Sequence, residues 1–212
     1  MKVPFWNDGE DWYMKNNESN EREKKVMNVT VYCGASLGNE KEYKECAENM
    51  GKWIGENNHT LVYGGGKVGL MGTVADAVLK EGSKVYGVMP SFLQEREITH
   101  LSLTKMITVD NMTERKKIMM EMGDVFIALP GGPGTLEEIS EVISWSRIGQ
   151  NSKPCIVFNV NGYYDSLKNM YDTMVKEGFL TEEDRNKILF SDSFDEIEEF
   201  IGKYEPPKVR EY

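Results

Sequence analysis

The stretch Leu129-Pro130-Gly131-Gly132-Pro133-Gly134-Thr135-Leu136-Glu137-Glu138 decides how this chain folds. It follows the apolar run 125–128 and precedes apolar side chains at helical spacing, so the pattern predicts a buried strand, a glycine-rich turn and a helix. A helix N-terminus gathers unpaired backbone N–H groups and the positive end of the helix dipole, which attract a phosphate. The glycines also let a ligand approach the backbone closely. We therefore expect this turn to hold a nucleotide phosphate and Glu138 to act on the nucleotide.

Composition limits the classes to which the chain can belong. Its 212 residues suit one α/β domain with a single core. The net charge of -10 argues against general binding to nucleic acid or to anionic membranes, so a phosphate site needs local Lys or Arg side chains. The three cysteines show no paired spacing, which disfavours a disulfide framework and a metal site. With no apolar leader and no run of membrane-spanning length, we expect a cytoplasmic protein.

Strand and helix patterns alternate along the chain. This order, with strands that are apolar throughout, predicts an α/β protein with a Rossmann-like three-layer fold, in which helices cover both faces of a parallel sheet. Strands are expected at 29–33, 60–63, 84–89, 106–109, 125–129 and 155–160, and helices at 40–56, 74–78, 115–122, 135–145, 164–176 and 194–201.

The chain divides into one domain and two terminal segments. Residues 27–204 are expected to form a single nucleotide-binding α/β domain, and 205–212 a polar C-terminal tail. Residues 1–26 carry mixed charge and four aromatic side chains. Two readings stay open for this N-terminal extension: it is partly disordered, or its aromatic rings dock on the domain or on a second subunit.

Three of the predicted strands end in glycine or serine turns, after Cys33, Tyr63 and Leu129. Ligands of parallel sheets bind beyond the carboxyl ends of the strands, so these turns are expected at one binding rim. The turn 64–72 matches the bare pattern Gly-x-Gly-x-x-Gly. A dinucleotide cofactor is nevertheless disfavoured, because this is the second βα unit and no acid follows about 20 residues later. Close packing of a small-residue helix is the other explanation for these glycines.

Each candidate catalytic residue also has an ordinary structural explanation. Thr135 and Glu138 have the spacing of a capping box, in which each side chain accepts a hydrogen bond from the other residue's backbone amide. Arg115 precedes Lys116 and Lys117 and could lie on a solvated helix face, with Asp110 or Thr113 as the helix cap. Neither residue is decisive alone.

Three motifs in order change this balance: Gly-x-x-Gly-Leu-Met-Gly at 66–72 (with Lys67 at its second position), Glu-Arg-Lys at 114–116, and Pro-Gly-Gly-x-Gly-Thr-x-x-Glu at 130–138. From about Val29 to Phe179, the chain resembles the LOG family of cytokinin riboside 5'-monophosphate phosphoribohydrolases, often labelled lysine decarboxylase-like. The resemblance implies an enzyme that cleaves the N-glycosidic bond of a purine nucleoside 5'-monophosphate to free base and ribose 5-phosphate. It implies no cofactor and no metal, and a homodimer.

The resemblance also assigns roles to residues. It implies that Arg115 and Glu138 are catalytic. The family has Met-His before Glu-Arg-Lys, whereas this chain has Thr113 at the position of the histidine, which puts base preference or rate in question. The substrate-binding positions implied by the resemblance are Glu97, Lys116, Gly132, Pro133, Gly134, Thr135 and Ser144.

Two alternative functions belong to other classes of protein. A decarboxylase of this label would need pyridoxal phosphate on a lysine, and no such lysine stands out in the sequence. A non-catalytic nucleotide-binding or carrier protein on the same fold is the stronger alternative, because a fold does not fix a function. The joint presence of Arg115 and Glu138 favours the enzyme.

Overall fold

The computed structural model describes residues 25–94 and 99–209, so residues 1–24 of the N-terminal extension and the substrate position Glu97 lie outside the described residues. Seven parallel strands form one sheet in the order β4-β3-β2-β1-β5-β6-β7. The strands are β1 (Asn28–Tyr32), β2 (Thr60–Tyr63), β3 (Val85–Pro90), β4 (Lys105–Val109), β5 (Val125–Ala128), β6 (Cys155–Phe158) and β7 (Ile188–Ser191). The helices are α2 (Lys41–Glu56), α3 (Gly69–Lys80), α4 (Ser91–Gln94), α5 (Met112–Met122), α6 (Pro133–Arg147), η1 (Val160–Gly162), α7 (Asp165–Lys176), α8 (Glu182–Arg185) and α9 (Phe194–Lys203).

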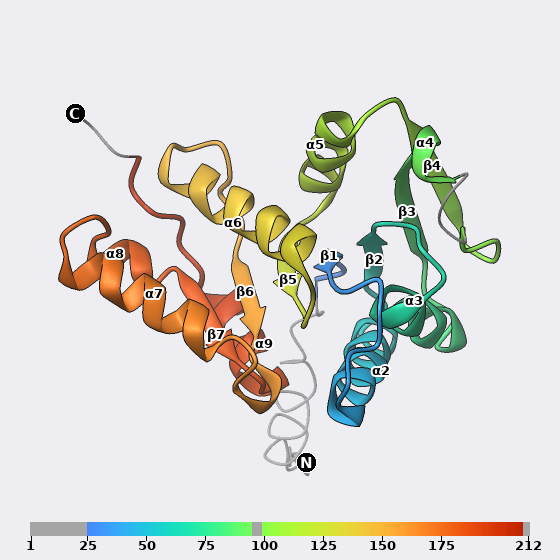
Figure 1. Cartoon of the computed structure of the whole chain (residues 1–212), viewed down its shortest axis with the longest axis horizontal. Helices are drawn as coiled ribbons and strands as arrows, with labels where there is room; N and C mark the ends of the chain where they lie inside the picture. The colour runs from blue at the N-terminus through green and yellow to red at the C-terminus, as the bar shows by residue number, and fades with distance from the viewer. Residues whose placement is uncertain (1–24, 95–98, 210–212) are drawn as a thin grey trace, which may run out of the picture.

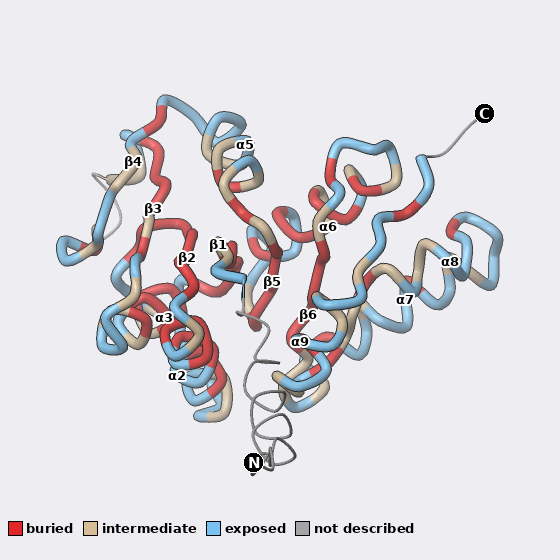
Figure 2. Tube along the Cα trace, turned by 180° about the vertical axis from the view of Figure 1, so that it is seen from behind, coloured by how far each residue is buried: buried red, intermediate tan, exposed pale blue. Residues whose placement is uncertain are grey.

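Helices cover both faces of the sheet, which confirms the predicted three-layer α/β fold (Figure 1). One core lies between the sheet and α2, α3 and α9, and the other between the sheet and α5, α6 and α7. The central strands β1, β2 and β5 are buried except at Asn28, the first residue of β1, and the outer faces of the helices are exposed (Figure 2). This accounts for strands such as β5 that lack polar alternation.

The chain changes direction across the sheet at β1. Its neighbour on one side is β2, the next strand in sequence, and on the other side it pairs with β5 through Val29–Val125 to Tyr32–Ala128. In an open parallel sheet, this switch point leaves a crevice beyond the carboxyl ends of the two strands. The glycine-rich turn that follows β5, at residues 129–134, therefore lies beside the turn after β1.

Sequence patterns missed four short elements and one cap. The edge strand β7 was not predicted, and neither were the helices α4, α8 and η1, because helices of three or four residues carry too little periodicity. The prediction that Asp110 or Thr113 caps α5 is wrong: the Asn111 side chain accepts from the Glu114 amide at 3.0 Å. The Glu114 carboxylate in turn accepts from the Asp110 amide, also at 3.0 Å.

The predicted C-terminal tail is partly packed. In its described part, Pro207 is buried, and the Val209 side chain packs over Gly149, where a Cβ would collide with it. Within the described residues, no helix combines the length and apolar character needed to cross a bilayer.

Helices α2 and α3 pack so closely that glycine is required between them. A Cβ at Gly51 would stand 2.5 Å from the Ala77 Cβ and 2.6 Å from the Val74 carbonyl oxygen. Such overpacking typically costs about 1–3 kcal/mol, which exceeds the helix propensity gained on replacing glycine by alanine. The close contact fixes α3, whose N-terminus supports the turn after β1.

We expect Gly51→Ala to lower the free energy of unfolding by about 1–2 kcal/mol, measured by urea denaturation. Gly202→Ala in α9 is the matched control, because a Cβ there meets nothing within 4 Å. It should raise stability by about 0.5–1 kcal/mol. Equal effects of the two substitutions would contradict the close packing of α2 on α3.

Candidate active site

A cavity of about 250 Å³ lies at the carboxyl ends of β1, β2 and β5, bounded by residues of α5 and α6. The turns after Cys33, Tyr63 and Leu129 all contribute to it, so the single rim predicted from the sequence is present. Its lining comprises Val31, Tyr32, Cys33, Gly34, Ala35, Gly64, Met71, Met112, Arg115, Met119, Gly132, Gly134, Thr135, Glu137 and Glu138.

Helix α6 starts three residues earlier than a capping box with Thr135 as the N-cap would require. Helix α6 begins at Pro133 with Gly132 as its N-cap, and no side chain caps it. Proline is well suited to this first position, because its missing N–H would have no partner there in any case. Thr135 lies inside the first turn with its hydroxyl against Gly131. The predicted capping box is therefore wrong, and the Glu138 carboxylate is free to face the cavity.

The N-termini of α3 and α6 differ in whether their amides have partners. In α3, the Leu70 amide donates to the Gly34 and Ser36 carbonyls at 3.0 and 3.3 Å, and the Met71 amide to Gly34 at 3.3 Å. In α6, the amides of Gly134 and Thr135 have no acceptor in the described part of the chain. The N-terminus of α6 therefore has free donors of the kind that bind anions.

The glycines of 64–72 serve packing. A Cβ at Gly72 would collide with the Lys67 carbonyl, and one at Gly64 with the Arg115 guanidinium. Gly69 has a φ of +66° and lies against the backbone of Ala35 and Ser36. These contacts support the structural explanation of the Gly-x-Gly-x-x-Gly pattern over a dinucleotide site.

Arg115 reaches from α5 into the cavity and is not on a solvated face. Its side chain is only 11% exposed and lies over Gly64. The guanidinium Nη1 contacts the Met112 sulfur at 3.7 Å, and the buried Nε has no hydrogen-bond partner in the described chain. A guanidinium stays protonated in proteins, so this group has donors in reserve for an anion or a substrate acceptor.

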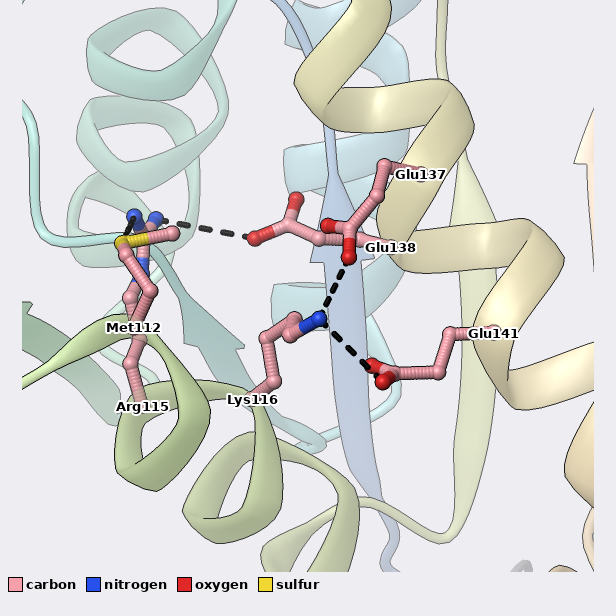
Figure 3. Close-up of polar contacts among 6 residues, drawn as sticks. All are labelled: Met112, Arg115, Lys116, Glu137, Glu138 and Glu141. Carbon is pink, nitrogen blue, oxygen red and sulfur yellow. Dashed lines mark hydrogen bonds and ion pairs between the residues drawn. The ribbon is translucent and has the colours of Figure 1, made fainter.

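Glu138 faces Arg115 across the cavity, with 3.8 Å between its Oε1 and the guanidinium Nη2 (Figure 3). Its side chain is also 11% exposed. Burial raises the pKa of this carboxyl to about 7, while the positive charge of Arg115 acts in the opposite direction. Near neutral pH the group is therefore divided between acid and carboxylate, which suits a side chain that exchanges a proton or stabilises positive charge.

Lys116 bridges α5 and α6 beside the cavity. Figure 3 shows its ammonium between Glu137 and Glu141, and the Glu141 carboxylate lies 3.1 Å away. Hydrogen bonds and charge from these two side chains raise the pKa of Lys116. In this arrangement the ammonium holds two helices together, and it lies outside the cavity lining.

The remaining predicted substrate positions fall in different places. Gly132, Gly134 and Thr135 line the cavity. Pro133 is exposed at the start of α6, whereas Ser144 lies farther along α6 and lines a separate cavity with Tyr171 and Leu180. Thr113, at the position of the family histidine, is exposed on α5.

Several residues of the site were missed in the sequence. Met71, Met112 and Met119 add thioether side chains to the cavity lining, and thioethers pack well against apolar or aromatic groups. Met71 and Met112 stand inside motifs that were recognised, but isolated methionines carry no signal of their own. No cluster of three potential metal-ligating side chains occurs among the described residues.

Comparison with known proteins identifies the family. A family model described as possible lysine decarboxylase matches residues 71–201. A cytokinin riboside 5'-monophosphate phosphoribohydrolase of Arabidopsis thaliana is 42% identical over 186 residues, covering 88% of this chain and 87% of the relative. The chain belongs to the LOG family. A phosphoribohydrolase of the same name from Rhodococcoides fascians is 46% identical over 162 residues, covering 76% of this chain and 82% of the relative.

Solved structures share the fold of this LOG family member at lower identity. The molybdenum cofactor carrier protein of Chlamydomonas reinhardtii has a TM-score of 0.66 at 16% identity, covering 84% of this chain and all of that one. The molybdenum cofactor binding protein of Rippkaea orientalis has a TM-score of 0.63 at 21% identity, covering 84% and 96%. These likenesses establish the Rossmann-like architecture.

The raised pKa of Glu138 predicts a pH-dependent stability. Its ordinary value is 4.5 and its folded value about 7, so between these pH values the folded chain binds more protons than the unfolded chain. Stability from this group is present at low pH and is lost as pH rises to about 7, by up to about 3 kcal/mol. Relative to wild type, Glu138→Gln should gain stability over this window.

Urea denaturation at pH 5, 6, 7 and 8 measures this difference. Glu121→Gln, an exposed carboxylate on α5, should instead follow the wild-type profile. Parallel profiles for wild type and Glu138→Gln would contradict the raised pKa.

The bridge made by Lys116 predicts a second effect. Lys116→Met keeps an aliphatic side chain but leaves Glu137 and Glu141 as like charges one helical turn apart. We expect a loss of about 1 kcal/mol at pH 7, because these pairs are partly shielded from water. Lys117→Met is the control, since Lys117 makes one exposed pair at 3.8 Å. Equal stabilities of the two variants in urea would refute the bridge.

Proposed function

We propose that this protein is a phosphoribohydrolase that hydrolyses the N-glycosidic bond of a purine nucleoside 5'-monophosphate. Water adds to the anomeric carbon, the base leaves with a proton, and the products are free base and ribose 5-phosphate. AMP and cytokinin riboside monophosphates are the proposed substrates, by analogy with the relatives' names. The observation that carries the proposal is the buried Arg115–Glu138 pair beside the unpaired amides of α6.

The phosphate is assigned to the N-terminus of α6. Unpaired amides and the helix dipole supply the positive potential that a chain of net charge -10 otherwise lacks. Glu138 follows Thr135 by three residues, so both lie on one face of the helix about 5 Å apart along its axis. A ribose ring spans such a distance, which sets the Glu138 carboxylate beside the glycosidic bond.

Glu138 and Arg115 take complementary roles in this proposal. Glycosidic cleavage passes through an oxocarbenium-like state, whose positive charge a carboxylate stabilises while it orients or deprotonates water. Arg115 does not act as a general acid because its guanidinium keeps its proton. It binds the phosphate or stabilises the negative charge that develops on the departing base. The methionine side chains of the cavity lining pack against the flat apolar surface of the base.

The other functions find less support. A pyridoxal phosphate decarboxylase needs a lysine aldimine, and no lysine of the described chain lines the cavity. A carrier needs the phosphate site but not the Arg115–Glu138 pair. We also propose a homodimer in the cytoplasm, in line with the family resemblance; the buried free thiols of Cys33, Cys46 and Cys155 are compatible with a reducing compartment.

The proposal predicts base release by the wild-type protein and its loss in two variants. Glu138→Gln should lower kcat at least about 100-fold while AMP still binds, because it removes the reacting carboxylate but leaves the amides. Arg115→Ala should lose both turnover and AMP affinity. Chromatography of free base from a panel of nucleoside monophosphates measures turnover, and calorimetry measures binding.

Glu121→Gln controls for loss of charge and should keep wild-type turnover. Near-normal turnover of Glu138→Gln would refute the catalytic assignment. AMP binding by wild type without base release from any nucleotide would favour the carrier.

A further inference from the structure

Two tyrosine hydroxyls donate hydrogen bonds to backbone carbonyls of the glycine turn. The Tyr164 hydroxyl donates to the Leu129 carbonyl at 2.7 Å, and the Tyr163 hydroxyl donates to the Gly131 carbonyl at 2.6 Å. Between these, the Pro130 carbonyl accepts from the Gly34 amide at 3.0 Å. Three successive carbonyls of the turn are therefore fixed by groups from two other loops.

Fixing a carbonyl also fixes the amide that follows it. A peptide group is planar and trans, so its N–H points opposite to its C=O. With its carbonyl bound to Tyr163, the Gly131–Gly132 peptide directs the Gly132 N–H to the other side of the turn, and Gly132 lines the cavity. The N–H groups of Gly131 and Gly132 have no acceptor in the described chain. Of these two amides, that of Gly132 joins those of α6 at the cavity.

The glycines of the turn cannot hold this orientation by themselves. Glycine loses more conformational freedom on folding than any other residue, and Gly131, Gly132 and Gly134 fall within four positions. The orientation must come from contacts outside the turn. Each tyrosine hydroxyl supplies one.

The tyrosine ring positions are themselves determined by packing. The Tyr163 ring meets Tyr43 of α2 edge-on at 5.4 Å and Tyr164 at 4.8 Å, perpendicular to it. The Tyr164 amide donates to the Asn159 side chain at 2.7 Å. Asn161, with a φ of 52°, makes the tight turn that brings both tyrosines back to the rim after β6.

We propose that Tyr163 is a positioning residue for substrate phosphate: its hydroxyl orients the Gly131–Gly132 peptide so that the Gly132 amide faces the 5'-phosphate, while Tyr164 holds the Leu129 carbonyl at the start of the turn. This inference rests on the proposed function, because it takes the nucleotide phosphate as the occupant. The tyrosines do not touch the reacting atoms. Their loss therefore weakens binding of the phosphate and leaves the chemical step unchanged.

The test is removal of one hydroxyl at a time from the full chain. Tyr163→Phe keeps the ring contacts but frees the Gly131 carbonyl. We expect KM for AMP to rise about tenfold and kcat to stay within about twofold, since one oriented hydrogen bond is lost. The dissociation constant of ribose 5-phosphate, measured by calorimetry, should rise by the same factor. Tyr164→Phe should change KM less, because the Leu129 carbonyl precedes Pro130, which has no N–H.

Tyr43→Phe is the matched control. Its hydroxyl has no hydrogen-bond partner within the described residues, while its ring makes the same aromatic contact. It should keep wild-type KM and wild-type affinity for ribose 5-phosphate. Because Tyr163 is partly exposed, its variant is expected to fold, and it carries the test if Tyr164→Phe does not.

The outcomes separate this inference from the proposed function. Unchanged KM and ribose 5-phosphate affinity in Tyr163→Phe would overturn it, as would a fall in kcat alone, even with lowered thermal stability. If the wild type releases no base but binds AMP, weaker binding by Tyr163→Phe would support the inference while the proposed function fails. Absence of AMP and ribose 5-phosphate binding to wild type would overturn both.

Discussion

The turn between β5 and α6 can receive an anion because its carbonyl oxygens already accept hydrogen bonds from other loops of the protein. An unpaired carbonyl facing the cavity would repel a phosphate, and a buried carbonyl without a partner would destabilise the fold. Hydrogen bonds from Gly34, Tyr163 and Tyr164 remove both problems at once. The arrangement of β1, β5 and β6 around the switch point is what brings these three donors to one turn.

At the same rim, the Glu138 carboxylate, whose burial is energetically unfavourable, lies next to the Arg115 guanidinium. Burial alone would favour the neutral acid at Glu138, and Arg115 opposes this only in part, since their charged atoms are 3.8 Å apart. A closer pair would lock both groups to each other. The present spacing leaves the carboxyl near its titration midpoint and the guanidinium under-coordinated. Both groups are therefore ready to interact with a substrate between them.

The sequence predicted the sheet, its helices and the common rim, because apolar strands and glycine turns are local patterns with a strict geometric consequence. It could not distinguish the helix start at Pro133 from one at Thr135, since both leave Glu138 on the first turns. The family resemblance implied Lys116 as a substrate contact, and its ion pairs could not be read from the sequence because Glu137 and Glu141 lie on another helix. The roles of Tyr163 and Tyr164 also depend on a contact across about 30 positions. Their local signal, Asn161-Gly162 after an apolar strand, indicates only a turn at the same rim.

Two glycine-rich turns enter helices in this chain, yet one N-terminus is free. The amides of α3 are consumed by the loop after β1, whereas those of α6 have no acceptor in the described residues. A carrier protein could use the free terminus of α6 equally well, and solved carriers share this fold. A carrier gains nothing, however, from burying a carboxylate whose pKa is raised to about 7 beside that terminus. Such a group lowers stability at neutral pH, and its presence is best explained by chemistry on the proposed nucleotide substrate.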